Sequence, residues 1–316
     1  MSIFKLIFPC AFPTETPNTG GTPMSTSANT TTVMDNISYA ALIGINKYIA
    51  LQGNDLNGCE NDIADMSDEL ISFHNTPHDN IRMLASERAT FDNIQERMEW
   101  LVDVLQPGQK GVLHYSGHGA SVRGRNENGS LSNEEDQIIC PTDMDWDRPF
   151  TDKLIAKILS EIRPGAFIFF VSDSCHSGTV DRDLEQPKNN PHDHSKDMPR
   201  RILPPIDIAF RSKDVDGLTK RGMFASRGVQ DITFINEERH LLISGCKDSQ
   251  TSADAFINGR YNGALTYYLI KAHKEDRNAS WVDVHTKTLK YLLSNGYDQT
   301  PQLSGPETTL KTRMFA

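Results

Sequence analysis

Apolar and polar residues along the chain follow two periods, which predict strands and helices in turn. Short apolar runs that end at glycine or at polar residues predict strands at 38–45, 81–84 and 111–116. Between them, apolar residues at helical spacing predict helices at 59–73 and 90–105. Such alternation is typical of a parallel sheet with helices on both faces. The pattern therefore predicts an α/β fold.

The second half of the chain continues this pattern with wider gaps. Residues 123–136 are polar and rich in Gly and Asn, which favours a loop. After a helix at 151–162, the run Phe167–Val171 predicts a buried strand. Further elements are expected as a strand at 240–244, helices at 263–273 and 281–293, and an edge strand at 310–315. The last third therefore adds one or two strands and two helices to the same sheet.

Two segments fall outside the pattern. Residues 1–36 are crowded with Thr, Ser, Asn, Gly and Pro, a composition typical of a flexible leader. Residues 181–238 mix Pro, Asn, Asp, Lys and Arg with little periodicity, as long functional or disordered insertions do. We therefore expect a leader at 1–36, a large portion at 37–180, an insert at 181–238 and a small portion at 239–316 that completes the sheet.

Composition narrows the class of protein. A formal net charge of -10 over 316 residues, without a sustained basic patch, argues against a nucleic-acid partner. The apolar start MSIFKLIFPCAF is far shorter than the ~20 apolar residues of a membrane span, so no membrane partner is expected. Five cysteines are present, an odd number without CxxC spacing: Cys10, Cys59, Cys140, Cys175 and Cys246. They favour a reducing compartment, the cytoplasm, over a disulfide scaffold.

Two strand ends carry the candidate chemistry. The strand at 167–171 leads into a polar turn with Cys175 at its centre, and the strand at 111–116 leads into Gly117, His118 and Gly119. In open α/β sheets, ligands bind outside the carboxyl ends of the strands. A thiol is mostly protonated at neutral pH, so it needs a neighbour such as an imidazole to become a good nucleophile. His118 and Cys175 are therefore predicted to form one catalytic site.

The glycine beside the histidine suggests how an oxyanion would be held. The backbone N–H groups of Gly119 and Cys175 can both approach a developing negative charge. No side chain that orients the imidazole can be chosen from the sequence, although a backbone carbonyl would serve. Taken alone, a cysteine after a strand is more often inert core, and a histidine in a glycine-rich turn is more often structural. Their joint occurrence at two strand ends favours the catalytic interpretation.

Several separate motifs resemble one family. The His118 and Cys175 segments, HYSGHG and SDSCHSG, are similar to the histidine and cysteine motifs of the caspase superfamily, and DSCHSG is similar to its metacaspase branch. Four further motifs match in order: ALIGINKY at 41–48, LNGCENDI at 56–63, DQIICPTD at 136–143 and LISGCKDSQTSADA at 242–255. The resemblance implies a caspase-like three-layer sandwich whose mostly parallel central sheet carries helices on both faces.

The resemblance also implies that the protein is a cysteine endopeptidase, which cleaves peptides or proteins after Arg or Lys. By the same resemblance it is expected to be a monomer. The acidic pocket of the family maps onto Asp62 and Asp173. Two carboxylates facing a guanidinium would give charge-assisted recognition. An acid in the first turn of a helix is also common for dipole reasons, which is the plain alternative for Asp62.

Calcium is the implied cofactor. Acidic residues gather between 134 and 152, which fits either a solvated loop surface or a hard-cation site, although no EF-hand spacing is present. The family's calcium ligands would fall at Asp136, Asp152, Asp181 and Asp183, and one carboxylate of the usual set is missing. The pair His192 and His194 has no further His or Cys nearby, so a solvated loop is expected there.

The insert offers basic residues for self-cleavage, which can accompany activation in the family. The candidates are Lys196, Arg200-Arg201, Arg211, Lys213 and Lys220-Arg221. Two rival functions stay open at this point. One is a catalytically silent caspase-like interaction module, and the other is a related cysteine peptidase of different specificity.

Overall fold

The structure is a computed structural model of the 316-residue chain. It describes residues 36–125, 131–175, 194–205, 207–208, 238–246, 250 and 252–316. Residues 1–35 of the expected leader at 1–36 and most of the expected insert at 181–238 therefore lie outside the described residues. Within the described part, no helix is both long enough and apolar enough to cross a membrane.

A central sheet organises the described residues. Its strands run in the order β12-β9-β7-β3-β1-β2, and every neighbouring pair is parallel except β12 with β9. The bounds are β1 Tyr39–Gly44, β2 Ile81–Ala85, β3 Lys110–Ser116, β7 Phe167–Asp173, β9 His240–Ser244 and β12 Gln302–Ser304. The predicted α/β fold with a mostly parallel sheet is confirmed.

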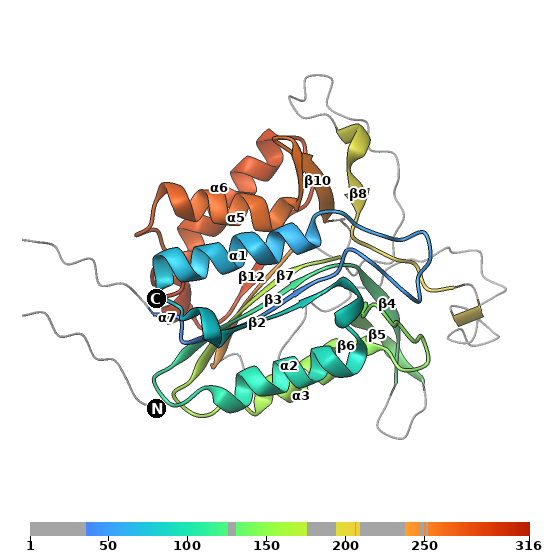
Figure 1. Ribbon diagram of the computed structural model, residues 1–316, viewed down its shortest axis with the longest axis horizontal. Coiled ribbons are helices and arrows are strands. Elements are labelled where there is room, and N and C mark those ends of the chain that lie inside the picture. The colour runs from blue at the N-terminus through green and yellow to red at the C-terminus, as the bar shows by residue number, and fades with distance from the viewer. Residues whose placement is uncertain are drawn as a thin grey trace, which may run out of the picture. The chain divides into compact units, whose positions relative to one another are not determined.

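Helices cover both faces of this sheet (Figure 1). On one face lie α1 (Cys59–His74), α5 (Ala264–Glu275) and α6 (Trp281–Ser294). The other face is covered by α2 (Phe91–Val104) and α3 (Asp152–Ser160). Among the described residues, short 3-10 turns lie at His78–Asn80, Ser86–Arg88 and His194–Lys196. The three layers are those of the predicted sandwich.

Strand β7 shows why two helical layers are needed. Its apolar side chains alternate between the faces, as the two-residue period of a strand requires. Ile168 and Phe170 belong to the core beneath α2 and α3. Phe169 and Val171 belong to the core beneath α1, α5 and α6. Since both faces of β7 are apolar, the strand is stable only when helices cover both.

Caps fix where the helices begin. Thr90 and Thr151 precede α2 and α3, and each side-chain oxygen accepts a hydrogen bond from a backbone N–H in the first turn. Ser280 and Asp283 form a reciprocal capping box at the start of α6. Such caps satisfy N–H groups that the helix itself leaves unpaired. Local sequence therefore determined these three boundaries.

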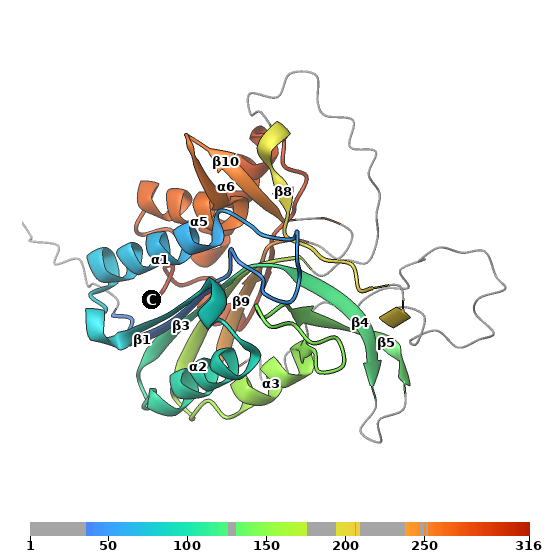
Figure 2. The same ribbon diagram turned by 45° about the vertical axis from the view of Figure 1, so that its right-hand side comes forward.

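The loop predicted at 123–136 is wrong for residues 123–125 and 131–136, where the structure has strands. β4 (Gly119–Arg125) and β5 (Leu131–Ile139) form an antiparallel pair, which Figure 2 shows extending beyond the central sheet, and β6 (Phe150–Thr151) pairs with β5. Polar residues can occupy a strand when one side faces solvent. The hairpin lacks the continuous apolar run that predicted the buried strands.

The edge strand predicted at 310–315 is also wrong. The edge is β12, and the short helix α7 (Glu307–Leu310) follows it. Met314 and Phe315 are buried, and the Phe315 ring packs edge-on against Trp281. The apolar residues at the end of the sequence therefore pack as core side chains without pairing as a strand.

A second small sheet was missed by the sequence analysis. β10 (Ala253–Ile257) and β11 (Arg260–Gly263) form a hairpin, and β8 (Met198–Pro199) pairs with β10. The hairpin turn is Asn258-Gly259, with φ values of 52° and 85°. Asn-Gly is favoured in such two-residue turns because both positions need positive φ. This dipeptide was the available signal for the hairpin.

Candidate active site

The carboxyl ends of β3 and β7 lie side by side and bring the two predicted catalytic segments together. Ser116 and Asp173, the last residues of these strands, are paired in register. Just beyond them, the backbone N–H of Gly117 donates to the carbonyl oxygen of Asp173 at 3.4 Å. His118 and Cys175 follow directly, so both leave the same edge of the sheet.

A backbone carbonyl orients the imidazole of His118. Its Nε2 lies 2.7 Å from the carbonyl oxygen of Asn54, and a carbonyl can only accept, so Nε2 carries the proton. Nδ1 is then the nitrogen with the free lone pair. Burial lowers the pKa of His118 to about 4, against the opposing effects of the Asn54 and Arg200 carbonyl groups. At neutral pH the ring is therefore neutral and can accept a proton.

Cys175 is fully buried at the same edge. Its Sγ accepts a hydrogen bond from the backbone N–H of Ser252, a contact that favours a negatively charged sulfur. The structure also joins Cys175 to Cys246 in a disulfide. The thiol chemistry considered below therefore belongs to the reduced protein.

The carbonyl oxygen of Arg200 occupies the position predicted for an oxyanion. It accepts hydrogen bonds from the backbone N–H groups of Gly119, at 3.1 Å, and Cys175, at 3.3 Å. These two donors are those that the sequence analysis selected. A peptide carbonyl held by two N–H groups beside a cysteine is arranged as the substrate of an acyl-transfer enzyme would be.

The Arg200 side chain enters a fully buried acidic pocket. Its guanidinium lies 2.8 Å from an Asp62 carboxylate oxygen, 3.4 Å from Asp173 and 2.9 Å from Asp254. All four side chains have no exposed surface. The structure thus brings together Asp62 and Asp173, the two acids singled out from sequence. It adds Asp254, which the sequence analysis missed although it lies in the LISGCKDSQTSADA motif.

Polypeptide N–H groups hold the three carboxylates in place. Asp254 accepts from the N–H groups of Asn57 and Gly58, just before α1. The other two acids are bonded near the start of α5, Asp62 by the N–H of Gly263 and Asp173 by the N–H of Thr266. Helix starts favour negative charge because their N–H groups are unpaired and the dipole is positive there. The pocket is therefore prepared for a cation.

The absence of a side chain at Gly263 leaves room for Asp173 and Arg200 in this pocket. A Cβ added at Gly263 would overlap both the Asp173 carboxylate and the Arg200 guanidinium. Any side chain at this position would therefore displace one member of the ion cluster. The requirement for glycine here arises from the close approach of the three groups.

Residues around Arg200 run through the site as an added strand. Met198 and Pro199 pair with β10, and the N–H of Arg200 donates to the carbonyl oxygen of Ser252 at 2.9 Å. On the other side of Arg200, the N–H of Ile202 donates to the carbonyl oxygen of Gly119 at 3.0 Å. Extended peptides commonly bind enzymes and receptors in this strand-like manner.

Two of the four predicted calcium ligands lie close together. Asp136 is on β5 and Asp152 opens α3, and the pairing of β5 with β6 brings them near each other. Burial, followed by the nearby charge of Asp136, raises the pKa of Asp152 to about 6. In this structure Lys153 Nζ lies 2.7 Å from Asp136. Asp181 and Asp183 fall outside the described residues.

The other acids and histidines singled out from sequence have local roles. Asp143 accepts from the N–H of Phe91 at the start of α2, and Asp145 accepts from the N–H of Asp147. His194 Nδ1 lies 2.7 Å from Asp197, which fits a hydrogen bond without a metal. His192 lies outside the described residues.

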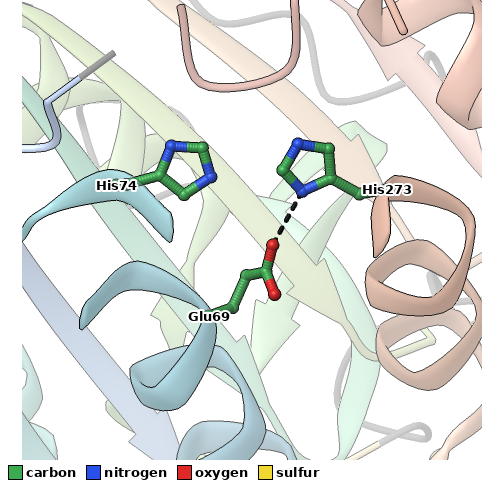
Figure 3. A group of neighbouring side chains, drawn as sticks. All are labelled: Glu69, His74 and His273. Carbon is green, nitrogen blue, oxygen red and sulfur yellow. Dashed lines mark hydrogen bonds and ion pairs between the residues drawn. The ribbon is translucent and has the colours of Figure 1, made fainter. Parts of the chain in front are cut away.

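Glu69, His74 and His273 form a separate buried cluster (Figure 3). The figure shows the Glu69 carboxylate bonded to His273, with His74 beside them. Their donor atoms lie within 4.8 Å of one another, which could suit a metal ion. Arg277 also pairs with Glu69, however. Although burial opposes it, hydrogen bonds from His273 and Arg277 lower the pKa of Glu69. A buried ion-pair network explains the cluster.

Comparison with known proteins agrees with this architecture. A model of the metacaspase peptidase C14 domain matches residues 39–184. Metacaspase-1B of Aspergillus terreus is 30% identical, over 84% of this chain and 74% of its own length. Metacaspase-1 of Scheffersomyces stipitis is 29% identical, over 84% of this chain and 70% of its own. The solved structure of protein GSU0716 from Geobacter sulfurreducens shares the fold, with a TM-score of 0.62, 23% identity and coverage of 89% of this chain and 98% of that one.

The caspase-like fold and these relatives define the chain as a cysteine-type endopeptidase. Within that class, the chain belongs to the metacaspase family, whose substrates are proteins.

Proposed function

We propose that this protein cleaves peptide bonds after Arg or Lys, using His118 and Cys175 as its catalytic dyad. The arrangement around Arg200 carries the proposal. One residue places its cationic side chain against Asp62, Asp173 and Asp254 while two backbone N–H groups hold its carbonyl. A substrate with Arg at the cleavage point would need the same two interactions. Lys carries the same charge on an extended stem.

The residues present define the steps of the reaction. His118 Nδ1 takes the proton of the Cys175 thiol, and the thiolate attacks the carbonyl carbon. Negative charge develops on the carbonyl oxygen, where the N–H groups of Gly119 and Cys175 stabilise it. His118 then gives its proton to the departing amine, leaving a thioester. Water, deprotonated by His118, hydrolyses the thioester and restores the thiol.

Self-cleavage after Arg200 is part of this proposal. Of the basic residues considered from sequence, Arg200 is the one in the described part of the chain whose side chain enters the acidic pocket. Lys196 instead places its Nζ 4.2 Å from the centre of the Phe256 ring. Arg211, Lys213, Lys220 and Arg221 lie outside the described residues. The bond between Arg200 and Arg201 is therefore the proposed self-cleavage point.

Calcium stimulation is proposed on the neighbouring carboxylates of Asp136 and Asp152. Calcium prefers several oxygen ligands. Burial and, after it, the charge of Asp136 raise the pKa of Asp152 to about 6, and a bound cation would offset both effects. Lys153 occupies the Asp136 carboxylate in this structure and would have to move. Asp181 and Asp183 are further ligand candidates by the sequence resemblance.

Hydrolysis of matched peptide reporters tests the function. Reporters that end in Arg, Lys or Asp before the cleaved bond would be compared under reducing conditions, with calcium and with chelator. We expect hydrolysis after Arg and Lys, none after Asp, and loss of at least about 1,000-fold in kcat for Cys175→Ala, because no nucleophile remains.

Two outcomes would favour the rival functions. No hydrolysis of any basic reporter in either calcium condition would favour a catalytically silent module. Cleavage that Asp173→Asn leaves unchanged would favour a cysteine peptidase of other specificity, because Asp173 contacts the Arg200 guanidinium in the pocket.

A further inference from the structure

Cys246 lies next to the proposed nucleophile, and the proposed reaction does not use it. Strands β7 and β9 are parallel neighbours, with Ser172 paired to Ser244. Cys175 and Cys246 follow these paired residues by three and two positions, so both leave the same edge of the sheet. Their Cα atoms are 6.3 Å apart, within the range that a disulfide spans, and the structure joins them.

The two sulfurs differ in exposure, so an oxidant in solution reaches them in a defined order. Cys175 is fully buried, whereas Cys246 is partly exposed, so a small solute meets Cys246 first. In the reduced protein, the Cys246 thiol has an acceptor, because the Gln250 carbonyl oxygen lies 3.3 Å from its Sγ. The Cys175 sulfur accepts a hydrogen bond from the Ser252 N–H, and in the proposed function His118, at the same edge of the sheet, is its base.

The other cysteines in the described residues do not react with an oxidant in place of Cys175 and Cys246, because burial protects them. Cys59 and Cys140 are both fully buried and unpaired. Burial raises the pKa of each thiol well above its usual range. A thiol reacts as its thiolate, so these two side chains stay inert under conditions that oxidise an accessible thiol.

We propose that Cys246 is the partner cysteine of a reversible oxidation site, and that hydroperoxides switch the enzyme off by linking it to Cys175. The Cys246 thiolate attacks the peroxide oxygen, giving a sulfenic acid and an alcohol or water. The Cys175 thiolate then attacks that sulfenic sulfur, hydroxide leaves and takes up a proton as water, and the disulfide forms. Two thiols are oxidised and one peroxide is reduced.

The consequence rests on the proposed function, because a Cys175 sulfur held in a disulfide has no thiolate to attack a peptide. In the structure the disulfide coexists with Arg200 in the pocket. The oxidised protein should therefore keep the Arg200–Arg201 bond intact as well as lose activity on added substrates. A dithiol reductant restores both thiols.

The test exposes reduced full-length protein to hydrogen peroxide, followed by dithiothreitol. Wild type is expected to lose at least about 90% of its hydrolysis of an Arg reporter and to recover it on reduction. Peptide mapping without reductant should then find a 175–246 linked pair. Cys246→Ser should form no such pair, and prolonged peroxide should inactivate it without recovery, because Cys175 then passes to the sulfinic acid. Cys140→Ala, a matched control, should behave as wild type.

Two results would overturn the inference. One is inactivation of wild type without the 175–246 pair, and the other is recovery of Cys246→Ser to the same extent as wild type. The mapping needs no activity, so it decides on the disulfide even if reduced protein hydrolyses no reporter. A failure of the proposed function would therefore be distinguishable from a failure of this inference.

Discussion

Asp254 lies in a motif that pointed to the family, but nothing near it in the sequence shows that its carboxylate belongs to the acidic pocket. Its carboxylate completes the ring of negative charge around the Arg200 guanidinium, at 2.9 Å. The N–H groups of Asn57 and Gly58 fix it from the other side, across almost 200 residues of sequence. A carboxylate held by two N–H groups keeps its orientation when the pocket is empty.

Replacing this acid should weaken recognition of basic substrates. We expect Asp254→Asn to lower kcat/KM for an Arg reporter by about 10- to 100-fold, because one charge-assisted hydrogen bond is worth roughly 1.5–3 kcal/mol. Reporter kinetics measure the change, and the exposed Asp68 on α1 supplies the control variant Asp68→Asn. An unchanged kcat/KM in Asp254→Asn would contradict this role.

Asp152 gives a prediction that depends on pH. Its pKa is raised to about 6 in the fold by burial and by Asp136, so the folded state holds this proton more tightly than the unfolded chain. Its charge therefore destabilises the fold above about pH 6, and the effect fades as the pH falls to about 4. Without calcium, Asp152→Asn should add about 1–2 kcal/mol to the free energy of unfolding at pH 7.5 and almost nothing near pH 4.

Denaturant unfolding of the Cys175→Ala protein at both pH values measures this effect. Calorimetric titration with calcium should show weaker binding for Asp152→Asn, while Asp103→Asn, on the exposed end of α2, should match the parent. Calcium affinity unaffected by Asp152→Asn would exclude this residue as a ligand.

At the scale of elements, β8 and the residues after it lie where a substrate strand would lie. Met198 and Pro199 pair with β10, the N–H of Arg200 donates to the Ser252 carbonyl oxygen, and the Arg200 carbonyl oxygen accepts from the N–H of Gly119. Each backbone hydrogen bond adds modest stability, but together they fix the register. The register places one peptide carbonyl, that of Arg200, at the two N–H donors.

Intact mass analysis should find cleavage between Arg200 and Arg201 in reduced wild type and not in Cys175→Ala. Arg200→Lys keeps a cation and should be cut more slowly, whereas Arg200→Gln should slow the cut at least about 100-fold. Lys196→Gln, outside the pocket, should be cut at the wild-type rate. Arg200→Gln leaves buried acids without a cation, which lowers the free energy of unfolding by about 3–5 kcal/mol and could unfold the variant. Arg200→Lys keeps the cation and therefore tests the same bond in a folded protein. Cleavage of Arg200→Gln at the wild-type rate would show that the Arg200–Arg201 bond is not the self-cleavage point.

At the scale of the folded domain, the central sheet contains strands from both sides of the proposed cleavage point. β7 precedes Arg200 in the chain and β9 follows it, yet the two strands are hydrogen-bonded neighbours. The core beneath α1, α5 and α6 likewise combines residues from both sides, such as Phe169 with Leu241 and Trp281. Cutting one bond therefore leaves sheet and core joined.

The two products of cleavage should consequently remain associated. On size-exclusion chromatography in native buffer, cut protein should elute as one species, at the volume of uncut Cys175→Ala protein. Denaturing mass analysis of that peak should find both fragments in equal amounts. Separation of the fragments in native buffer would show that the shared sheet does not hold them together.

Prediction from sequence succeeded where local pattern and tertiary environment agree. The apolar run at Phe167–Val171 and the cap at Thr90 predicted β7 and α2 because burial and capping act within a few residues. The hairpin of β4 and β5 was missed because its strands are largely polar. The end of the chain was misassigned because apolar side chains such as Phe315 fill a core without forming a strand.

The sequence by itself determined the strand ends that carry His118 and Cys175, and the motifs that point to the family. Only the tertiary structure decided which groups meet there: the Asn54 carbonyl contacts His118, and the Arg200 guanidinium contacts both Asp254 and Asp62. The reason is distance along the chain, because these contacts join residues 64, 54 and 138 positions apart. Local periodicity reports which side of an element is buried, but only the folded chain brings distant elements into contact.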